Sequence, residues 1–137
     1  MAKDVFHEQV KEALIKDGWT VTHDPLRFKY LEKWVEIDLG AEKLIVADKG
    51  TEKIAVEVKS FTEKSTIYAF HGALGQYRNY LRNMRKSNIE RVLFLAVPDD
   101  VYYDFFEHPY GMDAIEEENL KIIVFDAEGK IIVKWIK

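Results

Sequence analysis

The residues from Val35 to Phe61 constrain the fold most strongly, because apolar and charged side chains alternate along much of this stretch. Such alternation is typical of β-strands, in which successive side chains point to opposite faces. It places Glu57 and Lys59 on one face of a strand and Val56 and Val58 on the other. A carboxylate and an amine inside a Val- and Ile-rich strand cost desolvation free energy unless a neighbouring group interacts with them. This strand is therefore the first candidate for a functional site.

A second carboxylate, that of Asp38, lies in the preceding apolar run Val35–Leu39, which we also expect to be a strand. If the two runs pair, Asp38 lies beside Glu57. Two carboxylates with Lys59 alongside suit Mg²⁺ or Mn²⁺ bound next to a phosphate. The alternative is an edge strand that presents one charged face to solvent. The spacing alone does not separate these interpretations.

Length and composition indicate one soluble domain spanning residues 1–137. The net charge of −4 argues against a large basic nucleic-acid surface, although a local metal-binding pocket is itself acidic. The chain has no cysteine, which excludes disulfides and thiolate-bound metals. It shows no run of membrane-spanning length and no signal peptide at Met1, so we expect a cytoplasmic protein.

Periodicity and turn residues predict an α/β domain with a central mixed sheet flanked by helices. Helices are expected at Lys3–Asp17, with Asp4 as N-cap and Gly18 as terminator, at about Thr66 to Lys86 after a Ser65 cap, and at Asp99–Glu107 and Met112–Glu118. Strands are expected at Trp19–Thr22, Val35–Leu39, Lys43–Asp48, Lys53–Ser60, Arg91–Val97, Leu120–Phe125 and Lys130–Ile136. Residues Leu26–Lys33 are expected to be irregular, and Asp48–Thr51 to form a hairpin turn.

The long helix that we expect at Thr66 to Lys86 carries an apolar stripe on one side. The predicted stripe consists of Phe70, Ala73, Leu74, Tyr77, Leu81 and Met84. Gln76 and Tyr80 lie together at one margin of this stripe. The arginines at positions 78, 82 and 85 gather at the other margin, away from Gln76, which favours a solvated face or a partner contact.

The order of these elements resembles the core of the PD-(D/E)XK, or restriction-endonuclease-like, nuclease superfamily. The corresponding motif is Asp38 followed by Glu57-Val58-Lys59. The pair Gln76 and Tyr80 is similar to the Q-x-x-x-Y element on the following helix in RecB-type nucleases. The resemblance favours the metal site over the solvated strand.

Several further short sequence segments look like those of the XisH family, the fdxN element excision controlling factors of cyanobacteria. They are Phe6-His7-Glu8, Lys16-Asp17-Gly18-Trp19, His23-Asp24-Pro25, Glu57-Val58-Lys59-Ser60-Phe61 and Ala73-Leu74-Gly75-Gln76-Tyr77. The resemblance runs from the first helix to the C-terminus. It implies a role in excising a DNA element during heterocyst differentiation, together with a recombinase and the partner protein XisI.

On this resemblance, Asp38, Glu57 and the Val58 carbonyl would bind Mg²⁺ or Mn²⁺. Lys59 would orient the attacking water or neutralise charge developing on the phosphate. Gln76 would brace Lys59 or a DNA phosphate, and Tyr80 is given no role. The nuclease pattern often adds an acidic residue from the first helix, a position that falls here at His7 with Glu8 next to it. An exposed Glu8 and a boundary His7 without a metal role is an equally good interpretation.

Two functions follow as expectations. The first is a metal-dependent DNA endonuclease-like factor, for which a homodimer would suit duplex cutting. The second is a catalytically inactive regulator on a nuclease scaffold that binds XisI, DNA or the recombinase. The acidic net charge and the missing acid in the first helix suit the second. Fold analogy alone does not choose between them.

Overall fold

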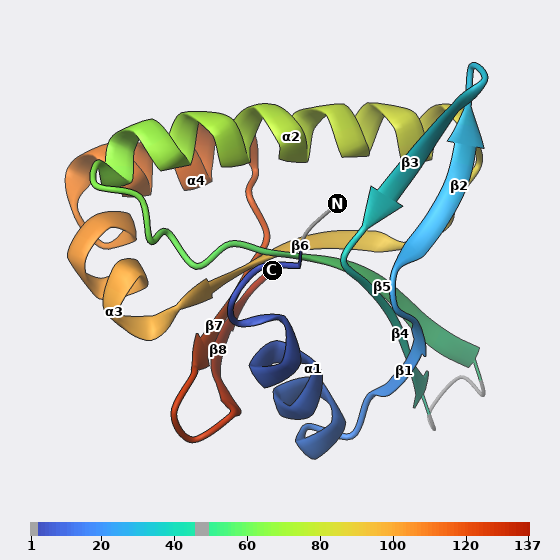
Figure 1. Ribbon diagram of the computed structural model, residues 1–137, viewed down its shortest axis with the longest axis horizontal. Helices are drawn as coiled ribbons and strands as arrows, with labels where there is room; N and C mark the ends of the chain where they lie inside the picture. The colour runs from blue at the N-terminus through green and yellow to red at the C-terminus, as the bar shows by residue number, and fades with distance from the viewer. Residues whose placement is uncertain (1–2, 46–49) are drawn as a thin grey trace.

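The computed structural model describes residues 3–45 and 50–137, which form helices packed on both faces of a mixed sheet (Figure 1). The helices are α1 (His7–Lys16), α2 (Thr66–Lys86), α3 (Asp99–Val101), a π-helical turn η1 (Tyr102–Phe106) and α4 (Pro109–Glu118). The strands are β1 (Thr20–His23), β2 (Leu26–Tyr30), β3 (Lys33–Ile37), β4 (Leu39–Ile45), β5 (Gly50–Val58), β6 (Val92–Pro98), β7 (Ile122–Asp126) and β8 (Ile131–Ile136). None of the helices in these residues is long and apolar enough to cross a membrane.

Six strands form the main sheet in the order β1-β4-β5-β6-β7-β8. Strands β5, β6 and β7 are parallel, and the outer pairs are antiparallel. Strands β2 and β3 form a separate antiparallel hairpin that rises beside the C-terminal half of α2 (Figure 1). The prediction of an α/β domain with a central mixed sheet between helices is confirmed.

Strand alternation divides the buried side chains between the two faces of the sheet. On β6, Leu93 and Leu95 belong to the core under α2, whereas Phe94 and Ala96 belong to the core under α1. Burial on both faces explains why the central parallel strands are continuous apolar runs rather than alternating ones. The sheet therefore has no free face along its centre.

Helix α1 begins later than predicted because Asp4 does not serve as its N-cap. The Asp4 carboxylate accepts hydrogen bonds from the backbone N–H of Phe6 and from both the N–H and the hydroxyl of Ser60. These bonds tie the N-terminal segment to the end of β5 and leave the first helical residue at His7. The helix ends before Gly18, whose φ of +94° suits glycine, as predicted.

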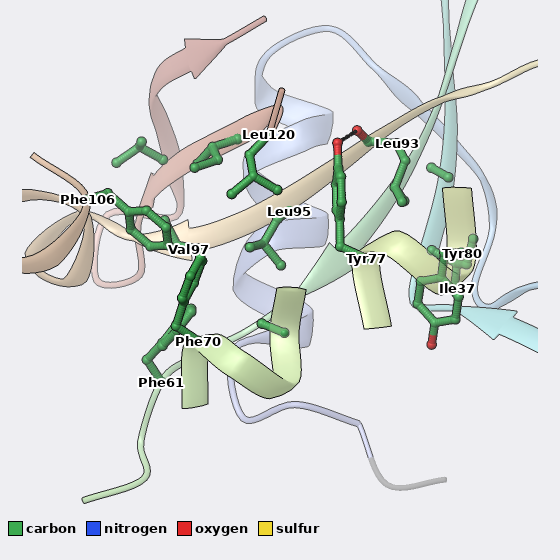
Figure 2. Packing of buried hydrophobic residues seen from close by; sticks show 14 of the residues in the cluster. Ile37, Phe61, Phe70, Tyr77, Tyr80, Leu93, Leu95, Val97, Phe106 and Leu120 are labelled. Atoms are coloured by element: carbon green, nitrogen blue, oxygen red, sulfur yellow. Dashed lines mark hydrogen bonds between the residues drawn. The ribbon is translucent and has the colours of Figure 1, made fainter. Parts of the chain in front are cut away.

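Helix α2 has the predicted bounds, and its Ser65 cap accepts a hydrogen bond from the N–H of Tyr68. Its buried side is rotated slightly from the predicted stripe. Tyr80 is buried there, whereas Leu81 is 39% exposed. The β2–β3 hairpin packs beside the helix and covers the Tyr80 side, as Figure 2 shows for Ile37 and Tyr80. Tyr80 thus packs at the margin of the core, which is the structural interpretation of its position beside the stripe.

The prediction that Leu26–Lys33 is irregular was wrong, because Leu26–Tyr30 is strand β2. Leu26 and Phe28 face the core under α2, and the charged residues alternate with them on the outer face. The hairpin turn is made by Leu31 and Glu32, both with positive φ. Neither is the glycine or asparagine that usually marks such a turn, which is why the sequence pattern concealed it.

The predicted strands around Asp38 are also divided differently. The run Val35–Leu39 contains the end of β3 and the first residue of β4, and Asp38 lies between these strands rather than within one. The predicted strand Lys43–Asp48 belongs to β4 as far as Ile45. The rest of it, and much of the predicted turn Asp48–Thr51, lie outside the described residues. The C-terminal hairpin of β7 and β8 is confirmed.

Tyr77 joins helix α2 to the sheet through its hydroxyl, which donates to the Leu93 carbonyl at 3.1 Å (Figure 2). The same oxygen accepts from the N–H of Lys121 at 3.3 Å. We expect Tyr77→Phe to lower the free energy of unfolding by about 1–2 kcal/mol, because both backbone groups lose a partner in a buried setting. Chemical denaturation measures this change. Tyr68→Phe, at an exposed tyrosine of the same helix, is the matched control and should stay within about 0.5 kcal/mol of the parent. Equal stabilities for the two variants would contradict the role of Tyr77.

Candidate functional site

A cleft of about 460 Å³ opens where α1, the β2–β3 hairpin, the end of β5 and α2 approach one another. The four side chains singled out from the sequence all line it: Asp38, Glu57, Lys59 and Gln76. They come from three separate parts of the chain and are brought together by the pairing of β4 with β5 and the packing of α2. His7 and Asp24 line the same cleft.

Glu57 occupies the second-to-last position of β5 and is only 6% exposed. The alternation of β5 places Val56 and Val58 in the core under α1, so Glu57 points to the opposite face, where α2 and the hairpin lie. Its Oε1 accepts a hydrogen bond from the backbone N–H of Asp38 at 3.3 Å. The strand therefore holds a carboxylate at the edge of the apolar core.

Asp38 lies at the point where the chain leaves the hairpin and enters the sheet. Its Oδ2 accepts a hydrogen bond from the backbone N–H of Val58 at 2.7 Å. Together with the bond from the Asp38 N–H to Glu57, this makes a reciprocal pair of bonds between the β3–β4 junction and the end of β5. The two carboxylates are thereby brought close, as the sequence predicted, although Asp38 is in a connection rather than a strand.

The two carboxylates are buried together, and this changes their acidity. Burial, reinforced by the negative charge of Asp38, raises the pKa of Glu57 to about 8, while Lys59 acts in the opposite direction. Burial also raises the pKa of Asp38, against the hydrogen bond from Val58. At neutral pH the pair therefore retains a proton unless a cation compensates both charges. A divalent cation would supply that compensation.

Lys59 follows the last residue of β5, although its N–H still donates to the Ala96 carbonyl at 3.0 Å and continues the pairing with β6. Its Nζ lies 3.8 Å from Oε2 of Glu57, and the side chain is partly exposed. The ammonium therefore stands at the solvent side of the carboxylate pair. From there it can reach an anion that enters the cleft.

Gln76 projects from α2, and its Nε2 donates to the hydroxyl of Tyr80 at 2.9 Å. Its Oε1 is buried and makes no hydrogen bond within the described residues. Burial, with the nearby charges of Glu57 and Asp38, raises the pKa of Tyr80, so this phenol stays neutral. Gln76 thus lines the cleft and is held by Tyr80 rather than by Lys59, and its carbonyl oxygen is buried.

His7, expected at a boundary, is 3% exposed, and its Nε2 lies 2.7 Å from Oδ1 of Asp24. The other oxygen of Asp24 accepts from Nζ of Lys11 at 2.8 Å. Burial acts to raise the pKa of Asp24, but the hydrogen bonds and charges of Lys11 and His7 outweigh it and leave the pKa below its usual value. Sequence reasoning missed Asp24, because its partners His7 and Lys11 are distant from it along the chain.

Two groups of side chains have the composition of a cation site. His7, Glu8 and Asp24 have ligand atoms within 4.8 Å of one another. In that group His7 Nε2 and both Asp24 oxygens have partners, as do Oδ2 of Asp38 and Oε1 of Glu57, and Glu8 is exposed as one interpretation predicted. The positive charges that act on the pair Asp38 and Glu57 are those of Lys59, 3.8 Å from Glu57, and of His7, which acts to lower the pKa of Asp38. The donor set of hard carboxylate oxygens and the buried like charges therefore fit Mg²⁺ or Mn²⁺ better at the Asp38–Glu57 pair.

The raised pKa of Glu57 predicts a pH-dependent stability. The folded chain keeps a proton on Glu57 up to about pH 8, whereas the unfolded chain releases it near the ordinary value of 4.5. The stabilisation that comes from protonated Glu57 is fully present below pH 4.5. As the pH rises from 4.5 to about 8, the free energy of unfolding falls by at most about 1.4 kcal/mol per pH unit.

Denaturation at several pH values in EDTA measures this slope. Glu57→Gln should flatten it, whereas Glu42→Gln, on β4 outside the cleft, should leave it unchanged. A Glu57→Gln variant with the slope of the parent would show that Glu57 has an ordinary pKa.

Comparison with known proteins places the chain among homologues. A crystal structure of an XisH family protein from Nostoc punctiforme PCC 73102 is 43% identical, with a TM-score of 0.86, and the match covers 98% of this chain and 100% of that one. The crystal structure of an fdxN element excision controlling factor protein from Anabaena variabilis is also 43% identical, with a TM-score of 0.87 and the same coverage. No curated protein matches.

The family model described as XisH protein matches residues 1–133, which include α1, the hairpin, the whole cleft and the first half of β8. The match thus covers the cleft residues and the scaffold that positions them. On this match, and on the two crystal structures, the chain belongs to the XisH family.

Proposed function

We propose that this chain is a metal-dependent DNA endonuclease-like factor with a restriction-endonuclease-like, PD-(D/E)XK core. The observation that carries the proposal is the buried Asp38–Glu57 pair with Lys59 beside it in an open cleft. Burying two carboxylates costs free energy that a structural role alone does not return. Sites that bind a cation next to a phosphate use this combination of groups.

The relative from Anabaena variabilis is named as an fdxN element excision controlling factor protein, and it matches over nearly the full length of this chain. We therefore propose that this chain acts in the excision of such a DNA element. Its partners would be DNA, a recombinase and XisI. A homodimer would place two sites on one duplex.

In this proposal, Asp38, Glu57 and the Val58 carbonyl hold Mg²⁺ or Mn²⁺. When bound, the ion would polarise the scissile phosphate and lower the pKa of an attacking water. The reciprocal hydrogen bonds orient both carboxylates before any ligand arrives. Lys59 contributes a positive charge toward the phosphate from the solvent side. Gln76, held by Tyr80, would brace Lys59 or a DNA phosphate from the wall of the cleft.

A second function is supported by one specific observation. At the position where the nuclease pattern carries an acidic residue in the first helix, this chain has His7, which is already paired with Asp24. A site with one ligand fewer suits a regulator that binds DNA or XisI without cutting. The same cleft would then serve recognition rather than hydrolysis.

DNA cleavage tests the two functions against each other. We expect the purified chain to cut DNA with Mn²⁺ and not with EDTA, and Asp38→Asn or Glu57→Gln to lower the rate by at least about 100-fold, because each removes a ligand charge. Plasmid, linear and branched substrates should each be tried with and without XisI. Glu42→Gln is the matched control, since it removes a carboxylate outside the cleft.

Circular dichroism and thermal unfolding would verify that each variant is folded. Cleavage by Glu57→Ala as fast as the parent would rule out the proposed mechanism. If the folded parent cuts no substrate, the regulator is the better assignment. Mn²⁺ binding measured by calorimetry then tests the site independently, and its loss in Asp38→Asn would show that these carboxylates bind the metal even without cleavage.

A further inference from the structure

The outer face of the β2–β3 hairpin presents an exposed tryptophan to solvent. The strand register pairs Lys29 with Trp34 and Arg27 with Glu36, and these four side chains point away from the core under α2. Trp34 is 58% exposed. A large indole at the surface of a projecting hairpin contributes nothing to the core and costs free energy in water. The indole is therefore available to a ligand.

Neighbouring charges hold this indole in place. The guanidinium carbon of Arg27 lies 4.4 Å from the centre of the Trp34 ring, and Nζ of Lys29 lies 5.3 Å from it. Arg27 is fixed in turn by Glu36, with Nε to Oε1 at 2.9 Å. Both cations come from β2, the strand that pairs with β3. The ring is oriented before it meets a ligand, which lowers the entropic cost of binding.

A groove of about 530 Å³ lies beside β3, between the hairpin and α2. Trp34 and Lys33 line it from the hairpin, and Asn79, Arg82 and Asn83 line it from the helix. The groove shares Glu36 and Gln76 with the cleft that holds Asp38 and Glu57. A chain bound in the groove would therefore run directly into the candidate site. Arg82, expected on a different surface from Gln76, borders the same groove.

The charge of this region differs from that of the molecule. The chain as a whole has a net charge of −4, yet α2 contains Arg78, Arg82, Arg85 and Lys86 and no Asp or Glu. Arg78 is engaged with Glu118, whereas Arg82 donates to Asn79 within the groove. Lys33 adds a further cation from the hairpin. Among the charged residues that line the groove, Lys33 and Arg82 outnumber Glu36, so the groove favours an anionic ligand.

We propose that the β2–β3 hairpin and this groove bind single-stranded DNA, with a base stacked on Trp34 and phosphates near Lys33 and Arg82. Stacking on an aromatic ring beside basic residues is how sequence-tolerant single-strand sites work, and it requires an unpaired base, because the bases of a duplex already stack on one another. The further step, in which the bound strand leads into the Asp38–Glu57 cleft, rests on the proposed function.

Fluorescence anisotropy with a labelled oligodeoxythymidylate of about 20 nucleotides tests the proposal, with EDTA present so that binding is measured without cutting. We expect Trp34→Ala to weaken binding by about 5- to 100-fold, because the stacked base is lost. Trp34→Phe should retain most of the affinity, since it keeps an aromatic ring. Tyr110→Ala removes an equally exposed aromatic residue on α4 and should have no effect.

A strand of the same length made of abasic units separates stacking from charge, because it carries the same phosphates without bases. The parent should bind the abasic strand as weakly as Trp34→Ala binds the thymidine strand. Trp34→Ala should bind the abasic strand with the same affinity as the parent. The proposal would be overturned if the parent bound the two strands with equal affinity. It would also be overturned if Trp34→Ala and the parent bound the thymidine strand with equal affinity. Failure of the parent to bind either strand would overturn it as well.

The outcome is independent of the proposed cleavage. Binding that requires Trp34, together with no cutting in Mn²⁺, would reject the nuclease and keep the single-strand site. Cutting that is lost in Glu57→Gln but unaffected by Trp34→Ala, with unchanged binding, would keep the nuclease and reject this site. Thermal unfolding of Trp34→Ala confirms that the hairpin remains folded.

Discussion

The cleft depends on the two hydrogen bonds that Asp38 and the end of β5 exchange. The N–H of Asp38 reaches the side chain of Glu57, and the side chain of Asp38 reaches the N–H of Val58. These bonds fix the direction in which the chain leaves the hairpin and begins β4, and hence the register of β4 on β5. They also use a backbone donor for each carboxylate, which is how two buried acids are tolerated side by side. The same two hydrogen bonds therefore determine where the two carboxylates lie and how they are stabilised.

The remaining cleft residues supply what the carboxylate pair lacks. Lys59 provides a partly exposed positive charge, and Gln76, held by Tyr80, provides a neutral amide. His7, Asp24 and Lys11 form a second ionic group whose charges largely satisfy one another. The unbalanced charge is thus concentrated at Asp38 and Glu57. Such an arrangement lowers stability at neutral pH and favours binding of a cation.

Much of this arrangement could be predicted from the sequence, and the failures have physical causes. Helix α2, the central strands and the meeting of Asp38 with Glu57 follow from strong periodicity and a recognisable motif. The β2–β3 hairpin was missed because Leu31 and Glu32 make its turn without glycine or asparagine. Asp24 was missed because its partners, His7 and Lys11, are distant in sequence. Contacts of this kind depend on tertiary packing, which local patterns do not report.

The hairpin stands outside the hydrogen-bonded order of the main sheet, even though it is inserted between β1 and β4, which are neighbours in that sheet. Its outer face can therefore change without altering any pairing in the six strands. Substitutions on the hairpin therefore have effects that are separate from those of substitutions in the main sheet. Under the proposed single-strand site, substitutions at Arg27, Lys29 and Trp34 would change the ligand preference, while Asp38 and Glu57 in the neighbouring cleft keep their geometry. Ligand preference can thus diverge among relatives at little cost to folding.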